Sequence, residues 1–320
     1  MFSRPFIERL ILLLVGAYTT YYVGLIMMEK TMMLELGSKG SPEIKKKLEQ
    51  LLKKELILNS HEESLLSMVV FPENIDIDME DICGHFETKE LIKNMVLKPL
   101  GKDYVKRHEL LEPPNGIILY GPPGTGKTML AKAIAKQLQG IFINFEISSI
   151  ENKMYGESGK LIKALFTLAE KLKPCVIFMD ELDGIAASRN PFDQSFVTGI
   201  KTFMFAQLDG IIKRDSNILF IGATNKLGDI DSAMKRRLRL HIPIILPDSK
   251  ARKDIFSKQL KEPIMIDSEG MELLVKDTEN FSGSDLYEIC KLCAHLSVQK
   301  DVFPNITKEI AEKAINTFET

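Results

Sequence analysis

The segment GPPGTGKT, residues 121–128, is the feature that most constrains how this chain can fold. It matches the pattern G-x-x-x-x-G-K-[ST], and it stands between the apolar run GIILY and the amphipathic run MLAKAIAKQL. A strand, a glycine-rich loop and a helix in this order form the context that the pattern requires. We therefore predict a strand, a phosphate-binding loop and a helix over this stretch.

The residue types of this loop suit a site for nucleotide phosphates and Mg²⁺. Glycines let backbone N–H groups converge on phosphate oxygens, and the helix N-terminus adds the positive end of its dipole. We expect Lys127 to neutralise the β- and γ-phosphates and Thr128 to ligate Mg²⁺. The candidate nucleotide-binding residues here are Gly121, Pro122, Pro123, Gly124, Thr125, Gly126, Lys127, Thr128 and Met129.

Two further apolar runs each end in polar residues. The run CVIFM, residues 175–179, leads into Asp180 and Glu181, and the run NILFIGAT leads into Asn225. Carboxylates at a strand end beside a phosphate loop can hold Mg²⁺ and polarise a water molecule. We expect Asp180 to hold the metal, Glu181 to act as the general base and Asn225 to orient the attacking water. An Asn that merely initiates a turn remains the alternative for Asn225.

The segment after this third run bears on which nucleotide is bound. Residues 225–228 read NKLG, close to the N-K-x-D with which GTPases read guanine, but Gly228 stands where the acid is needed. Guanine N–H groups without an acceptor would be left unsatisfied. The pattern therefore favours ATP over GTP.

Near the N-terminus, Leu10 to Met28 form 19 residues without a charge. A helix of that length spans about 29 Å, close to the thickness of a bilayer's hydrocarbon core. We predict a single membrane span and so a lipid bilayer as a partner. A cleaved signal peptide and a buried core helix are the alternatives, both of which usually have a shorter apolar run.

After the span, a break at residues 37–42 precedes the run PEIKKKLEQLLKKELIL. Apolar residues from Ile44 to Ile57 recur at helical spacing with charges between them, which predicts an amphipathic connector helix. Lys45–Lys47 could contact acidic headgroups, although a solvated helix face is the simpler interpretation.

Charge and cysteine content exclude some classes of protein. Lys and Arg number 42 against 44 Asp and Glu, so the net charge is −2 and a general nucleic-acid binder is not expected. The 4 cysteines are too few and too scattered for the disulfide framework of a small secreted domain. Cys290 and Cys293 form C-x-x-C at helical spacing, for which core packing is favoured over zinc or redox chemistry.

Taken together, GPPGTGKT, FMDELDG, GATN, the arginine-rich IDSAMKRRLRL and the later FSGSDLYEIC resemble an AAA ATPase over roughly residues 70–320. The resemblance implies an α/β module with a parallel sheet and flanking helices, a small C-terminal helical lid, bound ATP and Mg²⁺, and a homo-oligomeric ring, usually a hexamer. The corresponding expected domains are an anchor over 1–30, a helical linker over 31–70, a large ATPase subdomain over 71–246 and a small subdomain over 247–320.

The resemblance also assigns further site residues. Arg236 and Arg239 fall on the family pattern D-x-A-x-x-R-x-x-R and resemble arginine fingers. Membrane-anchored relatives tend to have two adjacent arginines at this place, which makes Arg237 a further candidate. Arg236 is the safest of the three, and which residue is the second finger stays open. The expected adenine-binding residues are Asp81, Ile82, Gly84, Gly283 and Ser284, although Ser282 or Ser284 could equally be a helix N-cap.

Two loops resemble the family's pore loops. Tyr155, with Met154 before it, looks like the aromatic that grips a threaded polypeptide, and Arg189 is the candidate contact of the second loop. A surface tyrosine in a subunit interface is the alternative for Tyr155.

The layout of span, connector and one AAA domain resembles the AAA translocases of the outer mitochondrial membrane, the mitochondrial sorting proteins. That resemblance implies extraction of mislocalised tail-anchored proteins from the outer mitochondrial or peroxisomal membrane, with the ATPase domain in the cytosol. The alternatives are a microtubule-severing ATPase, an ATPase that disassembles endosomal-sorting complexes, and an ATP-binding scaffold without turnover.

Overall fold

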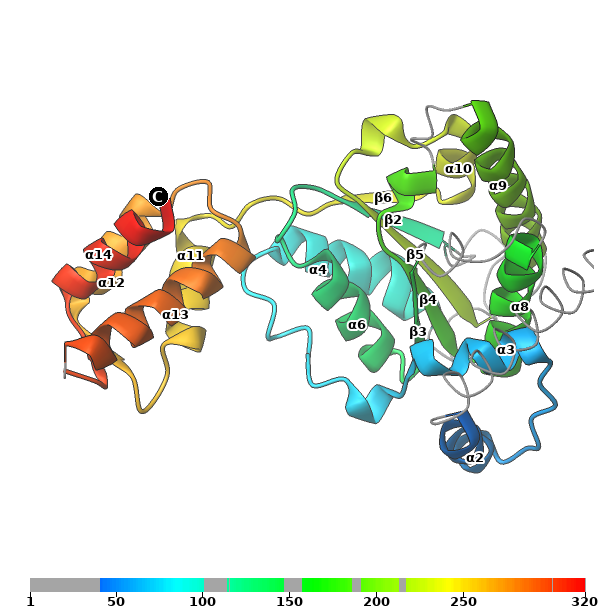
Figure 1. Cartoon of the computed structure of the whole chain (residues 1–320), viewed down its shortest axis with the longest axis horizontal. Coiled ribbons are helices and arrows are strands. Elements are labelled where there is room, and N and C mark those ends of the chain that lie inside the picture. The colour runs from blue at the N-terminus through cyan, green and yellow to red at the C-terminus, as the bar shows by residue number, and fades with distance from the viewer. Residues whose placement is uncertain are drawn as a thin grey trace, which may run out of the picture. The chain divides into compact units, whose positions relative to one another are not determined.

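The computed structural model describes residues 41–100, 114, 116–146, 157–185, 191–212, 217–300 and 302–319 (Figure 1). These residues fall into two compact units, one ending at Ser67 and the other running from Met68 to Thr320. The expected membrane span over 10–28 and the expected pore-loop residues Met154, Tyr155 and Arg189 lie outside the described residues. Within the described ranges, no helix combines the length and the apolar character needed to cross a membrane.

The first unit contains α2 (Ser41–Leu52) and α3 (Ser60–Ser64). The predicted connector helix is thus present but shorter than the apolar spacing indicates. It ends because Lys53 takes a left-handed backbone with φ 50°. Ile57, on the expected apolar face, is 80% exposed. The pattern over residues 53–57 therefore does not continue the helix.

The second unit is built on a sheet with strand order β1-β3-β4-β5-β2-β6. All neighbouring strands are parallel except β1, which is antiparallel to β3. The strands are β1 (Val69–Val70), β2 (Gly116–Tyr120), β3 (Ile141–Phe145), β4 (Cys175–Met179), β5 (Ile218–Thr224) and β6 (Leu240–Pro243). Because β5 lies between β2 and β4, the phosphate loop and both polar strand ends lie at one edge of the sheet.

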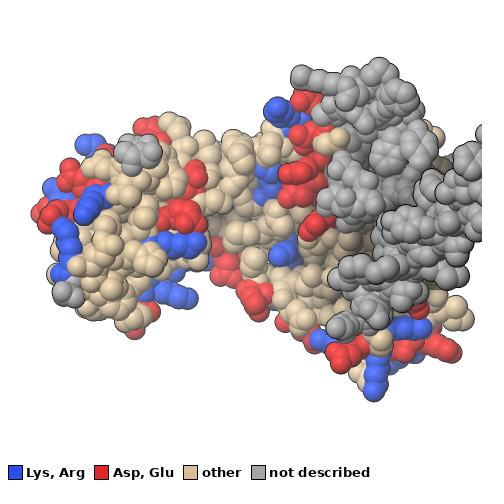
Figure 2. Space-filling view, in the orientation of Figure 1, with Lys and Arg blue, Asp and Glu red and all other residues tan. Residues whose placement is uncertain are grey.

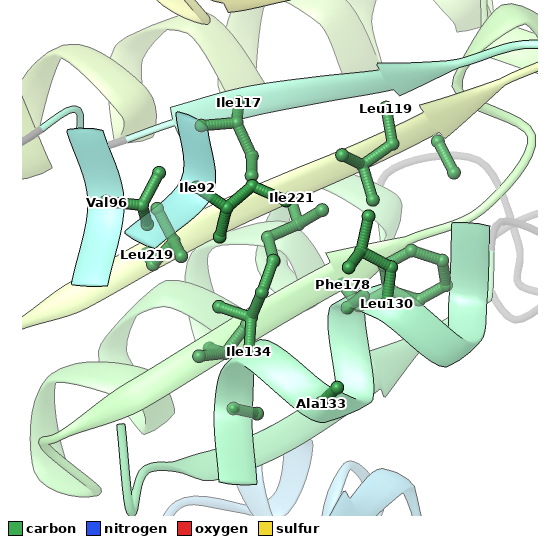
Figure 3. Close-up of a cluster of buried hydrophobic side chains, with 14 of the residues drawn as sticks. Ile92, Val96, Ile117, Leu119, Leu130, Ala133, Ile134, Phe178, Leu219 and Ile221 are labelled. Carbon is green, nitrogen blue, oxygen red and sulfur yellow. The ribbon is translucent and has the colours of Figure 1, made fainter. Parts of the chain in front are cut away.

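One face of this sheet packs on α4 (Phe86–Ile92), the π-helical turn η3 (Lys93–Leu97) and α6 (Lys127–Gln137). Figure 3 shows Ile134 and Leu130 of α6 lying against strand residues that include Phe178 and Ile221. These side chains are at most 2% exposed. Burial on both faces explains why the predicted strands read as continuous apolar runs.

Two long helices, α8 (Glu157–Lys171) and α9 (Pro191–Ile212), cover the other face of the sheet (Figure 1). Phe166 of α8 stacks on Phe220 of β5 with ring centroids 6.2 Å apart. The remaining short elements are η1 (Leu66–Met68), η2 (Pro72–Asn74), α5 (Lys98–Leu100), η5 (Leu182–Ile185), η6 (Leu227–Asp229) and α10 (Ser232–Arg237). The sheet with helices on both faces confirms the predicted α/β module.

The C-terminal part forms a helical lid with its own core. Its elements are α11 (Ser249–Gln259), β7 (Met265–Ile266), α12 (Ser268–Asp277), α13 (Gly283–Gln299), β8 (Asn305–Ile306) and α14 (Lys308–Glu319). Phe256 and Leu286 are fully buried in this core. On the face shown in Figure 2, positive and negative side chains are interspersed over the lid, whose apolar side chains pack inside. The expected lid is thus confirmed.

Candidate nucleotide site

A cavity of about 680 Å³ opens at the sheet edge where the phosphate loop lies. Its walls come from the phosphate loop, the ends of β4 and β5, the segment 81–85 before α4, and the lid helices α11 and α13. The volume lies within the range of small-molecule and cofactor sites. A nucleotide bound there would contact both the sheet and the lid.

Lys127 is the most tightly held cation of the cavity. Its side chain is 7% exposed. Nζ donates to the carbonyls of Gly121 and Pro122 at 2.9 and 2.7 Å and to Oδ1 of Asn225 at 2.8 Å. Burial lowers the pKa of Lys127, while Asp180 and Asp183 act in the opposite direction. A phosphate oxygen that binds Nζ would therefore replace one of these hydrogen bonds.

The loop backbone takes conformations that favour glycine at its turning points. Gly124 has φ 73° and Gly126 has φ 94°. At Gly121 a Cβ would lie 1.9 Å from the carbonyl oxygen of Ile244, so the loop and the strand end approach too closely for any side chain. Glycines thus keep the loop backbone free to face phosphates.

Thr128 and Asp180 supply oxygens that fit a magnesium ion. Thr128 Oγ1 donates to Asp180 Oδ2 at 3.3 Å, and both residues line the cavity. Hydroxyl and carboxylate oxygens are the ligands that Mg²⁺ takes beside nucleotide phosphates. The pair therefore fits the expected metal, which when bound would neutralise charge on the phosphates.

Glu181 directly follows Asp180 and also lines the cavity, with its side chain exposed. Its backbone is left-handed with φ 51°, and its N–H donates to Asp180 Oδ1 at 2.8 Å. A left-handed backbone at a non-glycine residue is uncommon and is found at functional sites. This hydrogen bond uses the backbone N–H of Glu181 and not its carboxylate, so the carboxylate is available for proton transfer.

One wall of the cavity, which includes the expected adenine-binding residues Asp81 and Ile82, is formed by Asp81, Ile82, Cys83 and His85. The pKa of Asp81 lies below its usual value because the Asp78 N–H and Lys258 stabilise the carboxylate. Burial lowers the pKa of His85, assisted by Lys89 and opposed by Asp248, which favours the neutral ring. Gly84 does not line the cavity, but its absent Cβ allows Ala251 of the lid to approach, since a Cβ would lie 2.7 Å from that of Ala251.

The lid contacts the phosphate loop through backbone atoms. Ser284 N donates to the carbonyl of Gly124 at 3.1 Å, and both Gly283 and Ser284 line the cavity. Ser282, not Ser284, is the N-cap of α13, in a capping box with Asp285. Lys258 of α11 donates to the carbonyl of Glu80 at 2.5 Å. The lid is thus bonded to two segments of the cavity wall.

The three candidate arginines are placed differently. Arg237 is half-buried and forms a bidentate pair with Asp209 of α9, with both N···O distances 2.8 Å. Its guanidinium also lies 4.5 Å from the Phe205 ring centroid. Arg236 and Arg239 are exposed. Arg237 is therefore engaged within its own chain, whereas Arg236 and Arg239 have solvent-facing side chains.

Most of the expected nucleotide and metal residues lie together in this cavity. The residues that line it are Asp81, Ile82, Pro123, Gly124, Thr125, Gly126, Lys127, Thr128, Met129, Asp180, Glu181, Asn225, Gly283 and Ser284. Gly121 and Pro122 contribute their carbonyls, which accept hydrogen bonds from Lys127 Nζ. Lys258 and Gln259 also line the cavity, and no local pattern in the sequence points to them. Tyr287 and Glu288 line it as well, and they follow Ser284 at helical spacing.

The C-x-x-C pair lies in the lid core. Cys290 and Cys293 of α13 are 5% and 0% exposed and are free thiols. Burial raises the pKa of each thiol to about 12. Protonated, buried thiols agree with the predicted packing role. Among the described residues, no group of three or more His, Cys, Asp or Glu could hold a metal ion.

One prediction concerns Lys127. Lys127→Met keeps much of the buried stem and removes the charged donor, so we expect ATP affinity to fall about 10- to 100-fold. Titration of a fluorescent ATP analogue, with the melting temperature as a check on folding, measures this. Lys132→Met, on the same helix but away from the cavity lining, is the matched control. Unchanged affinity in Lys127→Met would contradict the assigned phosphate contact.

Two family models match the chain. The model described as ATPase family associated with various cellular activities (AAA) matches residues 117–247, which include the phosphate loop and the ends of β4 and β5. A model of the parvovirus non-structural protein NS1 matches residues 14–143. The AAA match coincides with the part of the sheet that forms the cavity.

Relatives extend the similarity over almost the whole chain. The outer mitochondrial transmembrane helix translocase of Homo sapiens is 34% identical over 316 residues, 96% of this chain and 87% of the relative. One such translocase of Danio rerio is 37% identical over 254 residues, 79% of this chain and 70% of the relative. The crystal structure of the FIGL-1 AAA domain has a TM-score of 0.71 and 30% identity, covering 81% of this chain and 89% of that chain. The chain therefore belongs to the AAA ATPase family and is related to the outer mitochondrial transmembrane helix translocases.

Proposed function

We propose that this protein is a membrane-anchored AAA ATPase that extracts mislocalised tail-anchored proteins from the outer mitochondrial membrane. The observation that carries the proposal is the 34% identity to a transmembrane helix translocase over 96% of this chain. The uncharged run over 10–28 supports a single-pass anchor. We place the ATPase domain in the cytosol on the basis of the relationship to the outer mitochondrial translocases. The peroxisomal membrane is a second expected location.

The proposed hydrolysis uses the residues that meet at the sheet edge. Lys127 and the loop N–H groups bind the phosphates, and Thr128 with Asp180 holds Mg²⁺, which when bound offsets phosphate charge. Glu181 takes the proton of the attacking water, and Asn225 orients that water. Arg236 of a neighbouring subunit stabilises the charge that develops on the γ-phosphate. The site is complete only in an oligomer, for which we propose a hexamer.

The proposed substrate is an extended polypeptide that passes through the pore of the ring. Tyr155, with Met154 beside it, and Arg189 are the proposed contacts. An aromatic ring can pack on side chains of any sequence, which gives grip without selectivity. No nucleic acid is proposed as a partner.

Extraction of a reporter tail-anchored protein from proteoliposomes tests the proposal. We expect Tyr155→Ala to abolish extraction while it retains ATP hydrolysis, and Tyr155→Phe, which keeps the ring, to extract normally. Full extraction by Tyr155→Ala would contradict the threading role. Extraction by a Glu181→Gln protein that does not hydrolyse ATP would show that hydrolysis is not the energy source.

The second candidate is a microtubule-severing ATPase or one that disassembles endosomal-sorting complexes, and the 30% identity to the FIGL-1 AAA domain fits any ATPase with this module. That similarity covers the ATPase module, which these groups share. Cosedimentation of residues 31–320 with microtubules would favour this candidate. If the protein does not cosediment with microtubules and does extract the reporter, the result favours the translocase.

A further inference from the structure

Thr224 and Asp183 form a buried link between the two strand ends that carry Glu181 and Asn225. Thr224 is the last residue of β5 and is 1% exposed. Its Oγ1 donates to Asp183 Oδ1 at 2.7 Å and accepts from the Lys226 N–H at 3.0 Å. A hydroxyl has one proton and two lone pairs, so it can form both bonds at once. The hydroxyl therefore ties η5 to the residues on both sides of Asn225.

The turn that carries Glu181 is held at several points. Gly184 N donates to the Glu181 carbonyl at 2.8 Å. Leu182, 2% exposed, packs on β5 at Gly222, where a Cβ would lie 2.7 Å from Leu182 Cδ2. The left-handed backbone of Glu181 persists because such contacts determine it. Asp183 adds a polar contact to this turn, because its carboxylate accepts the hydrogen bond from Thr224 at the end of β5.

The link does not itself form the nucleotide site. The described residues that line the cavity include Glu181 and Asn225 but neither Asp183 nor Thr224. The carboxylate and the hydroxyl bind each other 2.7 Å apart and join the backbone of the two strand ends, while the negative charge of Asp183 also acts on Lys127. Loss of the bond would leave the half-buried Asp183 carboxylate and the Lys226 N–H each without this partner.

We propose that Asp183 and Thr224 are positioning residues that fix the separation between Glu181 and Asn225 for the attacking water. The proposal rests on the proposed hydrolysis, in which these two side chains act on the same water molecule. Because a misplacement of about 1 Å can slow catalysis about 100-fold, a loosened link lowers kcat. We expect nucleotide affinity to change little, because the phosphate loop contacts this end of β5 through the Thr224 carbonyl, which accepts from the Gly121 N–H, and through the Asn225 side chain, and not through the Thr224 hydroxyl.

Thr224→Val breaks the link with little change in shape. We expect kcat for ATP hydrolysis to fall about 10- to 100-fold, with KM and the affinity for ATP within about twofold of the wild type. Thr224→Ser, which keeps the hydroxyl but loses the methyl group, is the matched control and should retain kcat within about threefold. Wild-type kcat in Thr224→Val, or an equal loss in Thr224→Ser, would overturn the proposal.

Variants of the partner test the link from its more exposed side. Asp183→Ala should reproduce the loss of kcat, and Asp183→Asn, which keeps an acceptor oxygen, should not. The double variant Thr224→Val with Asp183→Ala should be no slower than either single variant, because both remove the same bond. Additive losses of kcat in the double variant would overturn the proposal. If Thr224→Val does not fold, the kcat of Asp183→Ala serves as the test.

Hydrogen exchange separates this proposal from the proposed hydrolysis. Amides of residues 179–185 should exchange faster in Thr224→Val and Asp183→Ala than in the wild type, while those of α6 should not. This readout does not require turnover. A wild-type protein without ATP hydrolysis would overturn the proposed function, whereas unchanged exchange over 179–185 would overturn the link.

Discussion

Glu181→Gln slows ATP hydrolysis about 100- to 10,000-fold while ATP still binds, if Glu181 is the general base. The amide of glutamine has nearly the same shape as the carboxylate but cannot take a proton from water. Glu181 lines the cavity beside Asp180, whereas the residues expected to bind the phosphates, Lys127 among them, belong to the phosphate loop. Phosphate release under saturating ATP, with binding measured separately, gives the two quantities.

The matched control for this variant is Glu170→Gln. Glu170 lies on α8, pairs with Lys173 at 2.6 Å and does not line the cavity. We expect its rate to equal that of the wild type. A Glu181→Gln protein that hydrolyses ATP at the wild-type rate would show that another group accepts the proton. Loss of binding in the same variant would instead point to a role in holding the nucleotide.

We expect Arg236→Ala to slow ATP hydrolysis about 1,000-fold without loss of stability, because we propose that this arginine acts on the nucleotide of a neighbouring subunit. Arg237→Ala lowers the melting temperature by about 2–4 °C, as expected when one partly exposed bidentate pair is lost from a domain of this size. The contrast follows from the structure, in which Arg237 binds Asp209 and Arg236 is exposed. Melting curves and phosphate release on each variant measure both effects.

A subunit-mixing experiment sharpens this prediction. Arg236→Ala and Glu181→Gln proteins should each be inactive alone, yet mixed rings should regain activity. A site with an intact Glu181 then faces a neighbour with an intact Arg236. Mixtures that co-assemble without recovery would contradict action across the subunit interface. Arg239→Ala in the same assay shows whether the second exposed arginine contributes.

The sheet-edge site could be predicted from the sequence because each of its parts follows a readable local pattern. An apolar run predicts a buried strand, and the polar residue after it predicts what lies at the strand end. Lys127 and Asn225 are far apart in sequence, but both follow such runs, and they lie within hydrogen-bond distance. Parallel strands place their carboxyl ends together, which makes this kind of site accessible to sequence analysis.

Contacts that depend on tertiary packing could not be predicted. Lys258 reaches Glu80 because α11 lies beside the segment before α4, and no local pattern encodes that neighbour. The Arg237 and Asp209 pair depends likewise on how α10 packs on α9. The end of α2 could not be predicted either, because the apolar residues Leu56 and Ile57 continue a helical spacing that the backbone of Lys53 interrupts.

The bond between Ser284 N and the Gly124 carbonyl joins the lid to the phosphate loop without using a side chain. Among the standard amino acids, only proline lacks the N–H at position 284, so every other substitution there leaves the donor in place. The backbone bond that connects the lid to the phosphate loop therefore persists when the side chain at position 284 changes. Residues on the outer faces of the lid helices can change to suit different neighbouring proteins, while the hydrogen bond between the lid and the phosphate loop stays the same.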